Sequence, residues 1–247
     1  MGIFAEFTYF LNTLSTELVW IIFLCFCFIS ILIFLKIFGY VGLYIYTSIA
    51  IIAANIQVLK TVDFFYSPKP VALGTVLFAS TFLCTDILSE NFDKQKARTN
   101  VLVGFLSFIF MTIIMLFTIG FKPSEIDWAH NSLVTIFSPM TRFFIASMIA
   151  YIISQYFDIW IYGLLKKITN NKNLWLRNNL STILSSLIDN TIFSILAWII
   201  LNPDPETLFN VIMIYILGTF LIRIFIAFLD TPIIYLSKFF ISKNINE

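Results

Sequence analysis

The stretch LVWIIFLCFCFISILIFLKI (residues 18–37) decides the class of fold, because its twenty residues include a single charge, Lys36. A transmembrane helix needs roughly 20 consecutive apolar residues to cross a hydrocarbon core about 30 Å thick. Residues 18–37 meet that requirement. The preceding residues include Glu6 and Glu17 but no basic residue, and no small-residue cleavage site follows, so we do not expect a signal peptide.

The composition of the whole chain also indicates membrane insertion. Of the 247 residues, 60% are apolar, 12% are charged and 29 are Phe, whereas about a quarter of the residues in a soluble domain are charged. A soluble enzyme of this composition would expose large apolar patches. The net charge of +1 offers no basic surface for nucleic acid. Three cysteines, all in apolar runs, supply neither a disulfide framework nor a metal site.

Apolar runs of sufficient length recur along the chain and predict seven transmembrane helices, at 18–37, 40–62, 71–91, 99–120, 139–166, 178–201 and 208–240. The predicted fold is therefore an all-α, polytopic helical bundle in the membrane. Lys and Arg number ten in one alternating set of loops and helix ends and three in the other. By the positive-inside rule, this asymmetry places the N-terminus outside and the C-terminus in the cytoplasm.

Polar side chains inside these helices are informative, because a charge near the bilayer centre costs several kcal/mol unless it faces a cavity or a partner. At 100° per residue, one face of the sixth predicted helix forms a polar stripe of Asn178, Thr182, Ser185 and Asp189. Other predicted helices also carry polar or charged residues, namely Asn55, Asp86, Glu90, Arg142, Gln155, Asp158, Arg223 and Asp230. Acids and amides on at least four helices predict a water-accessible site within the membrane.

These residues also have structural explanations. Ser and Thr stripes in membrane helices often allow close packing. The pairs Asp86–Arg223 and Asp189–Arg142 are candidate structural ion pairs, and Arg142 is also positioned to snorkel to the outer headgroups. Trp175 is a candidate interfacial anchor.

Several functions are excluded because the sequence lacks the motifs that they require. The chain has no P-loop for ATP hydrolysis, no zinc-protease spacing, no nucleophile elbow and no paired-Asp motif for a magnesium diphosphate. It also lacks a channel-type filter sequence. We therefore expect a small-solute transporter with no catalytic residues, no resident metal and no cofactor. Its acids, amides and aromatic side chains suit a flat heterocycle with several N–H donors.

Three segments carry a more specific likeness: TFLCTDILSENFDKQKAR (81–98), SMIAYIISQYFDIWIYGLLK (147–166) and LWLRNNLSTILSSLIDNTIF (174–193). Together with Asn55 and the Thr231-Pro232…Tyr235 ending, they resemble the queuosine precursor transporter family, also called the vitamin uptake transporter family. The likeness runs from about residue 40 to 240 and implies a six-helix transporter core at 40–247. Residues 1–39 would then be an N-terminal segment with one extra transmembrane helix.

The resemblance implies import of a 7-deazaguanine across the bacterial inner membrane for tRNA modification. The candidate substrates are the cyano and aminomethyl precursors of queuosine and the free base queuine. Combining this with the stripes, we hypothesise that Asp189 or Asp158 accepts hydrogen bonds from the ring N1–H and the exocyclic amine. The full set of candidate substrate-binding residues is Asn55, Asp86, Gln155, Asp158, Trp175, Asn178, Ser185 and Asp189. The candidate coupling or gating residues are Glu90, Arg142, Arg223 and Asp230.

Other classes remain open at this level. The main alternative to secondary transport is a substrate-binding membrane subunit that uses an ATPase module on other chains, as in ECF-like vitamin uptake systems. A membrane enzyme and a structural scaffold are weaker alternatives. The expected partners are the small-molecule substrate and the lipid bilayer, with no nucleic acid. The sequence leaves open whether the chain forms a homo-oligomer.

Overall fold

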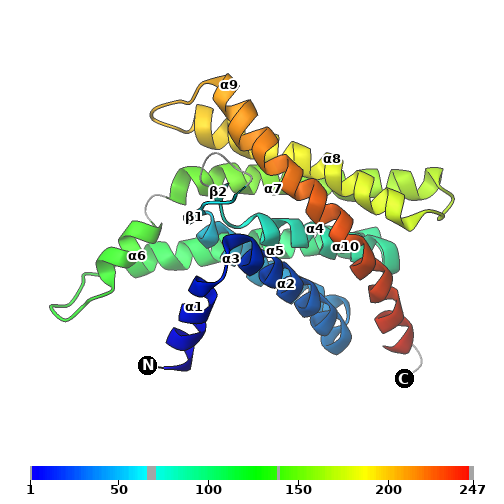
Figure 1. The fold of residues 1–247 in the computed structure, drawn as a ribbon, viewed down its shortest axis with the longest axis horizontal. Coiled ribbons are helices and arrows are strands. Elements are labelled where there is room, and N and C mark those ends of the chain that lie inside the picture. Colours follow the sequence, from blue (N-terminus) through cyan, green and yellow to red (C-terminus); the bar gives the residue numbers. More distant parts are fainter. Residues whose placement is uncertain (1, 66–70, 138–139, 245–247) are drawn as a thin grey trace.

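The computed structural model describes residues 2–65, 71–137 and 140–244, apart from the side chains of 140–142, 214, 218 and 242–244. The chain forms a helical bundle with one short β-hairpin (Figure 1). Its first half contains α1 (Ile3–Thr13), α2 (Thr16–Phe38), α3 (Tyr40–Gln57), the hairpin of β1 (Thr61–Val62) and β2 (Val71–Ala72), α4 (Thr75–Asn91) and α5 (Lys94–Gly120). Its second half contains α6 (His130–Phe137), α7 (Met140–Ile168), α8 (Leu174–Ile195), the π-helical η1 (Leu196–Ile200), α9 (Leu208–Asn210), the π-helical η2 (Val211–Ile216) and α10 (Leu217–Asn244).

Local sequence explains several of the helix boundaries. The Ser15 hydroxyl accepts a hydrogen bond from the backbone N–H of Leu18 and caps α2. The Asp93 carboxylate accepts from the N–H of Lys96 and caps α5 in the same way. Gly39 has a φ of +60°, a conformation that glycine adopts without a steric penalty, so α2 turns directly into α3.

Helix α4 is the centre of the bundle. It packs against α2, α3, α5, α7, α8 and α10, and 13 of its 17 residues are buried. Helices α7 and α8 form a long antiparallel pair, and α10 crosses α8 and α4 (Figure 1). Because α4 is enclosed by other helices, its polar side chains contact protein rather than lipid.

The predicted all-α polytopic fold is confirmed, and one predicted span, at 71–91, forms a helix shorter than the others. Among the described residues, six helices are long and apolar enough to cross a membrane: α2, α3, α5, α7, α8 with η1, and α10. The predicted span at 71–91 corresponds to α4, which begins only at Thr75 because Val71 and Ala72 pair with β1 instead. Its 17 residues reach about 25 Å, at the lower limit for a spanning helix, and they run from the hairpin to Glu90, which meets Lys166 near the end of α7.

The bundle has two distinct ends (Figure 1). The β-hairpin, α6 and the loop before α9 lie toward one end of the long axis, and the α7–α8 turn and the C-terminus lie toward the other. In that turn, Asn170, Asn171 and Asn173 have positive φ values, which Asn tolerates better than most residues. The side of the membrane that each end faces stays a prediction from the positive charges.

Candidate functional site

The polar stripe of α8 contacts acids on three neighbouring helices. Asn178 donates to Asp230 of α10 at 2.8 Å. Thr182 donates to Asp86 of α4 at 2.9 Å. All four side chains are buried. The predicted stripe therefore exists, and its first two members each donate a hydrogen bond to a carboxylate carried by another helix.

The other two members of the stripe form a reciprocal pair of hydrogen bonds with α7. Ser185 of α8 donates to Asp158 of α7 at 2.8 Å. One turn away, Ser154 of α7 donates to Asp189 of α8 at 3.1 Å. Because each helix supplies one serine and one aspartate, the two hydrogen bonds fix the register of α7 against α8.

Asp189 also forms the ion pair of this region. Its Oδ2 lies 2.7 Å from Nη1 of Arg223 on α10, and both side chains are about one-tenth exposed. Arg223 therefore pairs with Asp189, and not with Asp86 as one sequence interpretation had it. The side chain of Arg142 lies outside the described residues, so its candidate pairing and gating role stay predictions.

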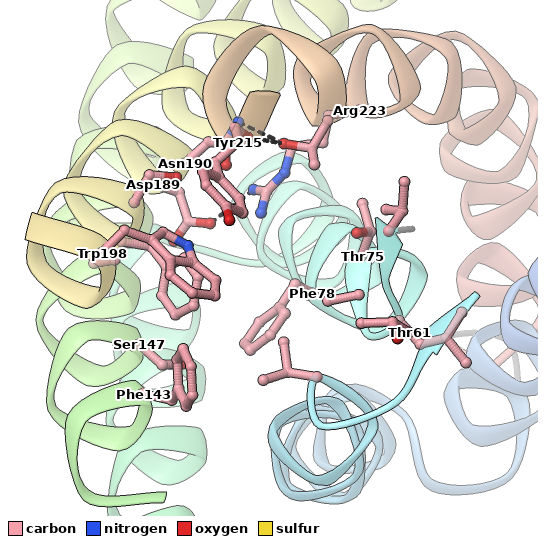
Figure 2. Close-up of a pocket in the computed structure, with 18 of the residues that line it drawn as sticks. Thr61, Thr75, Phe78, Phe143, Ser147, Asp189, Asn190, Trp198, Tyr215 and Arg223 are labelled. Atoms are coloured by element: carbon pink, nitrogen blue, oxygen red, sulfur yellow. Dashed lines mark hydrogen bonds and ion pairs between the residues drawn. The ribbon is translucent and has the colours of Figure 1, made fainter. Parts of the chain in front are cut away.

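A cavity of about 380 Å³ lies beside this ion pair (Figure 2). Its walls come from the β-hairpin, the first turns of α4 and α7, the end of α8, both π-helical segments and α10. Asp189 and Arg223 are its charged lining residues. A volume of this size is typical of small-molecule sites.

Aromatic side chains form much of the remaining wall. Trp198 of η1 and Tyr215 of η2 stack with ring centroids 4.4 Å apart and an interplanar angle of 16°. Phe143 of α7 meets Trp198 edge-on at 5.5 Å. Figure 2 shows Phe78 of α4 across the cavity from Trp198. The cavity thus combines flat apolar surfaces with a carboxylate and a guanidinium, which suits a planar polar ring.

The two π-helical segments position the stacked aromatic pair. Asn190 of α8 donates to the backbone carbonyl of Ile216 at 2.8 Å and to the hydroxyl of Thr219 at 2.7 Å. These hydrogen bonds tie α8 to the junction between η2 and α10. Single π turns inside α-helices are frequent at functional sites.

A second charged cluster closes the other end of the bundle. Glu90, at the end of α4, accepts from Arg177 of α8 at 2.6 and 3.1 Å, from Lys238 of α10 at 2.7 Å and from Tyr162 of α7 at 3.0 Å. Lys166 of α7 lies 3.4 Å from the same carboxylate. We call these five residues the Glu90 cluster. It joins four helices about 18 Å along α4 from the cavity wall at Phe78.

Several predicted substrate-binding residues lie away from this cavity. Asn55 donates to the carbonyl of Ile51 in its own helix, and Gln155 lies between Thr81 and Thr85 of α4. Asp86, Asp158, Asn178 and Ser185 are buried deeper between the helices and do not line it. Trp175 is half exposed in the first turn of α8, about 20 Å along the helix from Asp189. Of the predicted binding residues, the structure places Asp189 at the cavity.

The aromatic lining was missed at the sequence level. The chain holds 29 Phe residues, so composition does not distinguish the few at a cavity from those facing lipid. One usable signal exists: Trp198 and Tyr215 flank the Asn202-Pro203-Asp204-Pro205 turn, which brings the two segments side by side. Ser154 was also missed as a site residue, because its contact with Asp189 depends on how α7 and α8 pack.

Comparison with known proteins agrees with this architecture. A family model described as "Putative vitamin uptake transporter" matches residues 72–237, from β2 to the last third of α10. The chain belongs to the vitamin uptake transporter family. The matched region contains Asp189, Arg223 and the Glu90 cluster apart from Lys238.

A known relative extends the match over most of the chain. The "Probable queuosine precursor transporter" of Bacillus subtilis (strain 168) is 33% identical over 220 residues, which is 89% of this chain and 93% of the relative. No solved structure matches. The chain is thus a multi-pass membrane protein of a transporter family, as the resemblance of its local segments implied.

Proposed function

We propose that this protein imports 7-deazaguanine bases across the bacterial inner membrane by secondary transport, for use in tRNA modification. The single observation that carries the proposal is the cavity in which a buried carboxylate and guanidinium stand beside stacked aromatic rings. The similarity to the probable queuosine precursor transporter of Bacillus subtilis supports the choice of substrate class.

The hydrogen-bonding capacity of Asp189 supports a guanine-like edge. A carboxylate offers about four acceptor positions, and Ser154 and Arg223 use one position on each oxygen. One position per oxygen is left, which matches the two parallel donors of a guanine edge, the ring N1–H and the exocyclic amine. The adjacent base carbonyl would then face Arg223, which has donors and no acceptor.

The aromatic lining supplies the second part of recognition. A flat heterocycle held by its edge at Asp189 presents both faces to the cavity walls. Phe78 and Trp198 lie on opposite sides in Figure 2 and would stack on those faces. In this proposal Trp198, rather than Trp175, is the stacking tryptophan, because Trp175 lies at the far end of α8.

The Glu90 cluster supports a transport cycle. The cavity lies near one end of the bundle, and the cluster joins α4, α7, α8 and α10 near the other. Release of substrate to the second side requires these ion pairs to separate. With the predicted orientation, the cavity is nearer the outside and the cluster is the cytoplasmic closure, so this conformation is the one that accepts substrate for import.

A transport-dependent tRNA assay tests the proposal. The chain is expressed in a bacterium that neither synthesises queuosine precursors nor has its own importer, each candidate base is supplied at low concentration, and queuosine in tRNA is measured. We expect wild type and the exposed-loop control Asp204→Asn to restore the modification. Asp189→Asn should restore far less, because loss of hydrogen bonds to a charged group costs about 1.5–3 kcal/mol each, or roughly 10- to 150-fold in affinity.

Two results would contradict the proposal. Failure of every 7-deazaguanine to restore queuosine, with the protein present in the membrane, would contradict the substrate class. Full restoration by Asp189→Asn would contradict the assigned site. Uptake by the purified chain in sealed vesicles, with no ATPase added, distinguishes secondary transport from an ATPase-dependent binding subunit.

A further inference from the structure

Two buried carboxyl groups in the middle of the bundle face each other. Asp86 of α4 lies within hydrogen-bonding reach of Asp158 of α7, and both side chains are fully buried. Hydroxyl groups of α8 donate to both, Thr182 to Asp86 and Ser185 to Asp158. The remaining oxygens, Oδ1 of Asp86 and Oδ2 of Asp158, accept no hydrogen bond from the described residues.

Among the side chains that the structure describes, no cation neutralises this pair. Asp230 of α10 adds a further acid nearby, while Tyr162 of α7 and Cys84 of α4 are neutral. The two buried cations described on α8 and α10 are engaged elsewhere, since Arg223 pairs with Asp189 and Arg177 with Glu90. Helix α3 contains no charged residue, and the charges of α2 and α5 lie in their end turns, at Glu17, Lys36, Lys94, Lys96 and Arg98.

Two adjacent buried carboxylates without a cation repel each other and lack solvation. A single proton removes both problems, because the protonated group donates its O–H to the other carboxylate, as in other closely spaced carboxyl pairs. Among the residues that the structure describes, no three acidic, His or Cys side chains lie close enough together to hold a metal ion.

We propose that Asp86 and Asp158 share one proton, and that this pair is the ion-coupling site of the transporter. When the pair binds a proton, that proton comes from water, and the pair becomes one carboxylic acid hydrogen-bonded to one carboxylate. Release returns that proton to water and leaves two carboxylates. The coupling role rests on the proposed function, whereas the shared proton is a property of the ligand-free protein.

The geometry links this pair to both ends of the bundle. On α4, Phe78 lines the cavity, Asp86 lies about 12 Å further along and Glu90 about 6 Å beyond that. On α7, Asp158 is one turn from Ser154, which donates to the cavity residue Asp189. Loss of the proton pushes α4 away from α7 by charge repulsion, and therefore acts on the cavity wall and on the Glu90 cluster through the same helix.

Infrared spectroscopy of the purified, ligand-free chain tests the shared proton. Wild type at neutral pH should show the carbonyl band of a protonated carboxyl group, and Asp86→Asn and Asp158→Asn should each remove the same band. Each variant should fold, because the new amide donates to the remaining carboxylate as the proton did. The double variant should lose no more than either single variant, and Asp204→Asn should lose nothing.

Other patterns of band loss overturn the proposal. A double variant that loses twice as much would show two separate protons. No loss in either single variant would show that the pair is ionised. Since no substrate is present, these results stand even if 7-deazaguanine import fails.

Transport by the purified chain in sealed vesicles tests coupling, with the neutral cyano-substituted 7-deazaguanine as the probe. A pH difference of one unit, alkaline inside, should drive accumulation up to about tenfold if one proton accompanies each base. Asp158→Asn should still exchange labelled for unlabelled base but should not accumulate it. Accumulation driven by a sodium gradient, or pH-driven accumulation that survives in Asp158→Asn, would overturn the coupling role.

Discussion

The Glu90 cluster predicts a large difference in stability between two substitutions that each remove one charge. Arg177 is 1% exposed and Glu90 is 6% exposed, whereas Lys238 in the same cluster is 44% exposed. Removing one partner of a buried ion pair costs about 3–5 kcal/mol, because the other charge is left unpaired. Removing one partner of an exposed pair costs about 0–1 kcal/mol.

We therefore expect Glu90→Gln to lower the free energy of unfolding by about 3 kcal/mol, near the lower limit, because Gln still offers one acceptor to Arg177. Lys238→Met, the matched control at the exposed side of the cluster, should lower it by less than about 1 kcal/mol. The measurement is equilibrium unfolding of the purified chain in detergent. A double-mutant cycle with Arg177→Met separates pairing from other effects.

The double-mutant cycle compares the destabilisation of the double variant with the sum of the two single variants. The double variant should be destabilised by much less than the sum of the two single variants, because neither charge then remains buried and unpaired. The reasoning would be refuted if Glu90→Gln and Lys238→Met had equal effects. Simple additivity in the cycle would refute it equally.

Two other predictions concern the cavity and helix packing. Trp198→Ala should weaken binding of a 7-deazaguanine by about 0.5–1.5 kcal/mol or more, because it removes a stacking surface. Binding is measured by titration of the purified chain. The control Trp175→Ala should leave the affinity unchanged, and equal losses in the two variants would contradict the assignment of Trp198. Gly42→Ala should destabilise the chain by about 1–3 kcal/mol, measured by thermal unfolding, because its Cβ would collide with the backbone carbonyl of Phe34. Gly120→Ala, where an added Cβ meets nothing within 4 Å, should be close to neutral, and similar melting temperatures for both variants would disprove the packing argument.

Helix periodicity explains which parts of the site were predictable. The stripe of Asn178, Thr182, Ser185 and Asp189 follows from backbone geometry alone, since residues three or four apart share a face. The structure confirms that this face is buried and polar. The length of the apolar runs likewise predicted the helices, although the end of the predicted span at 40–62 and the start of that at 71–91 form the β-hairpin instead.

The partners of those residues were not predictable, because they depend on how separate helices pack. Periodicity cannot decide whether Arg223 faces Asp86 or Asp189, which lie on different helices. The Glu90 cluster shows the same limit, since its cations come from α7, α8 and α10. The aromatic cavity depends further on two π-helical segments, which are not encoded by a regular hydrophobic repeat.

The central claim is that Asp189 reads the N–H edge of a guanine-like base. The most direct test compares, by titration of the purified chain, a 7-deazaguanine with the same base lacking the exocyclic amine. A site built to pair a donor rejects an analogue that lacks it, so wild type should bind the complete base at least about tenfold more tightly. Asp189→Asn should bind both bases with similar, weaker affinity. Equal binding of the two bases by wild type, or unchanged discrimination in Asp189→Asn, would contradict the account.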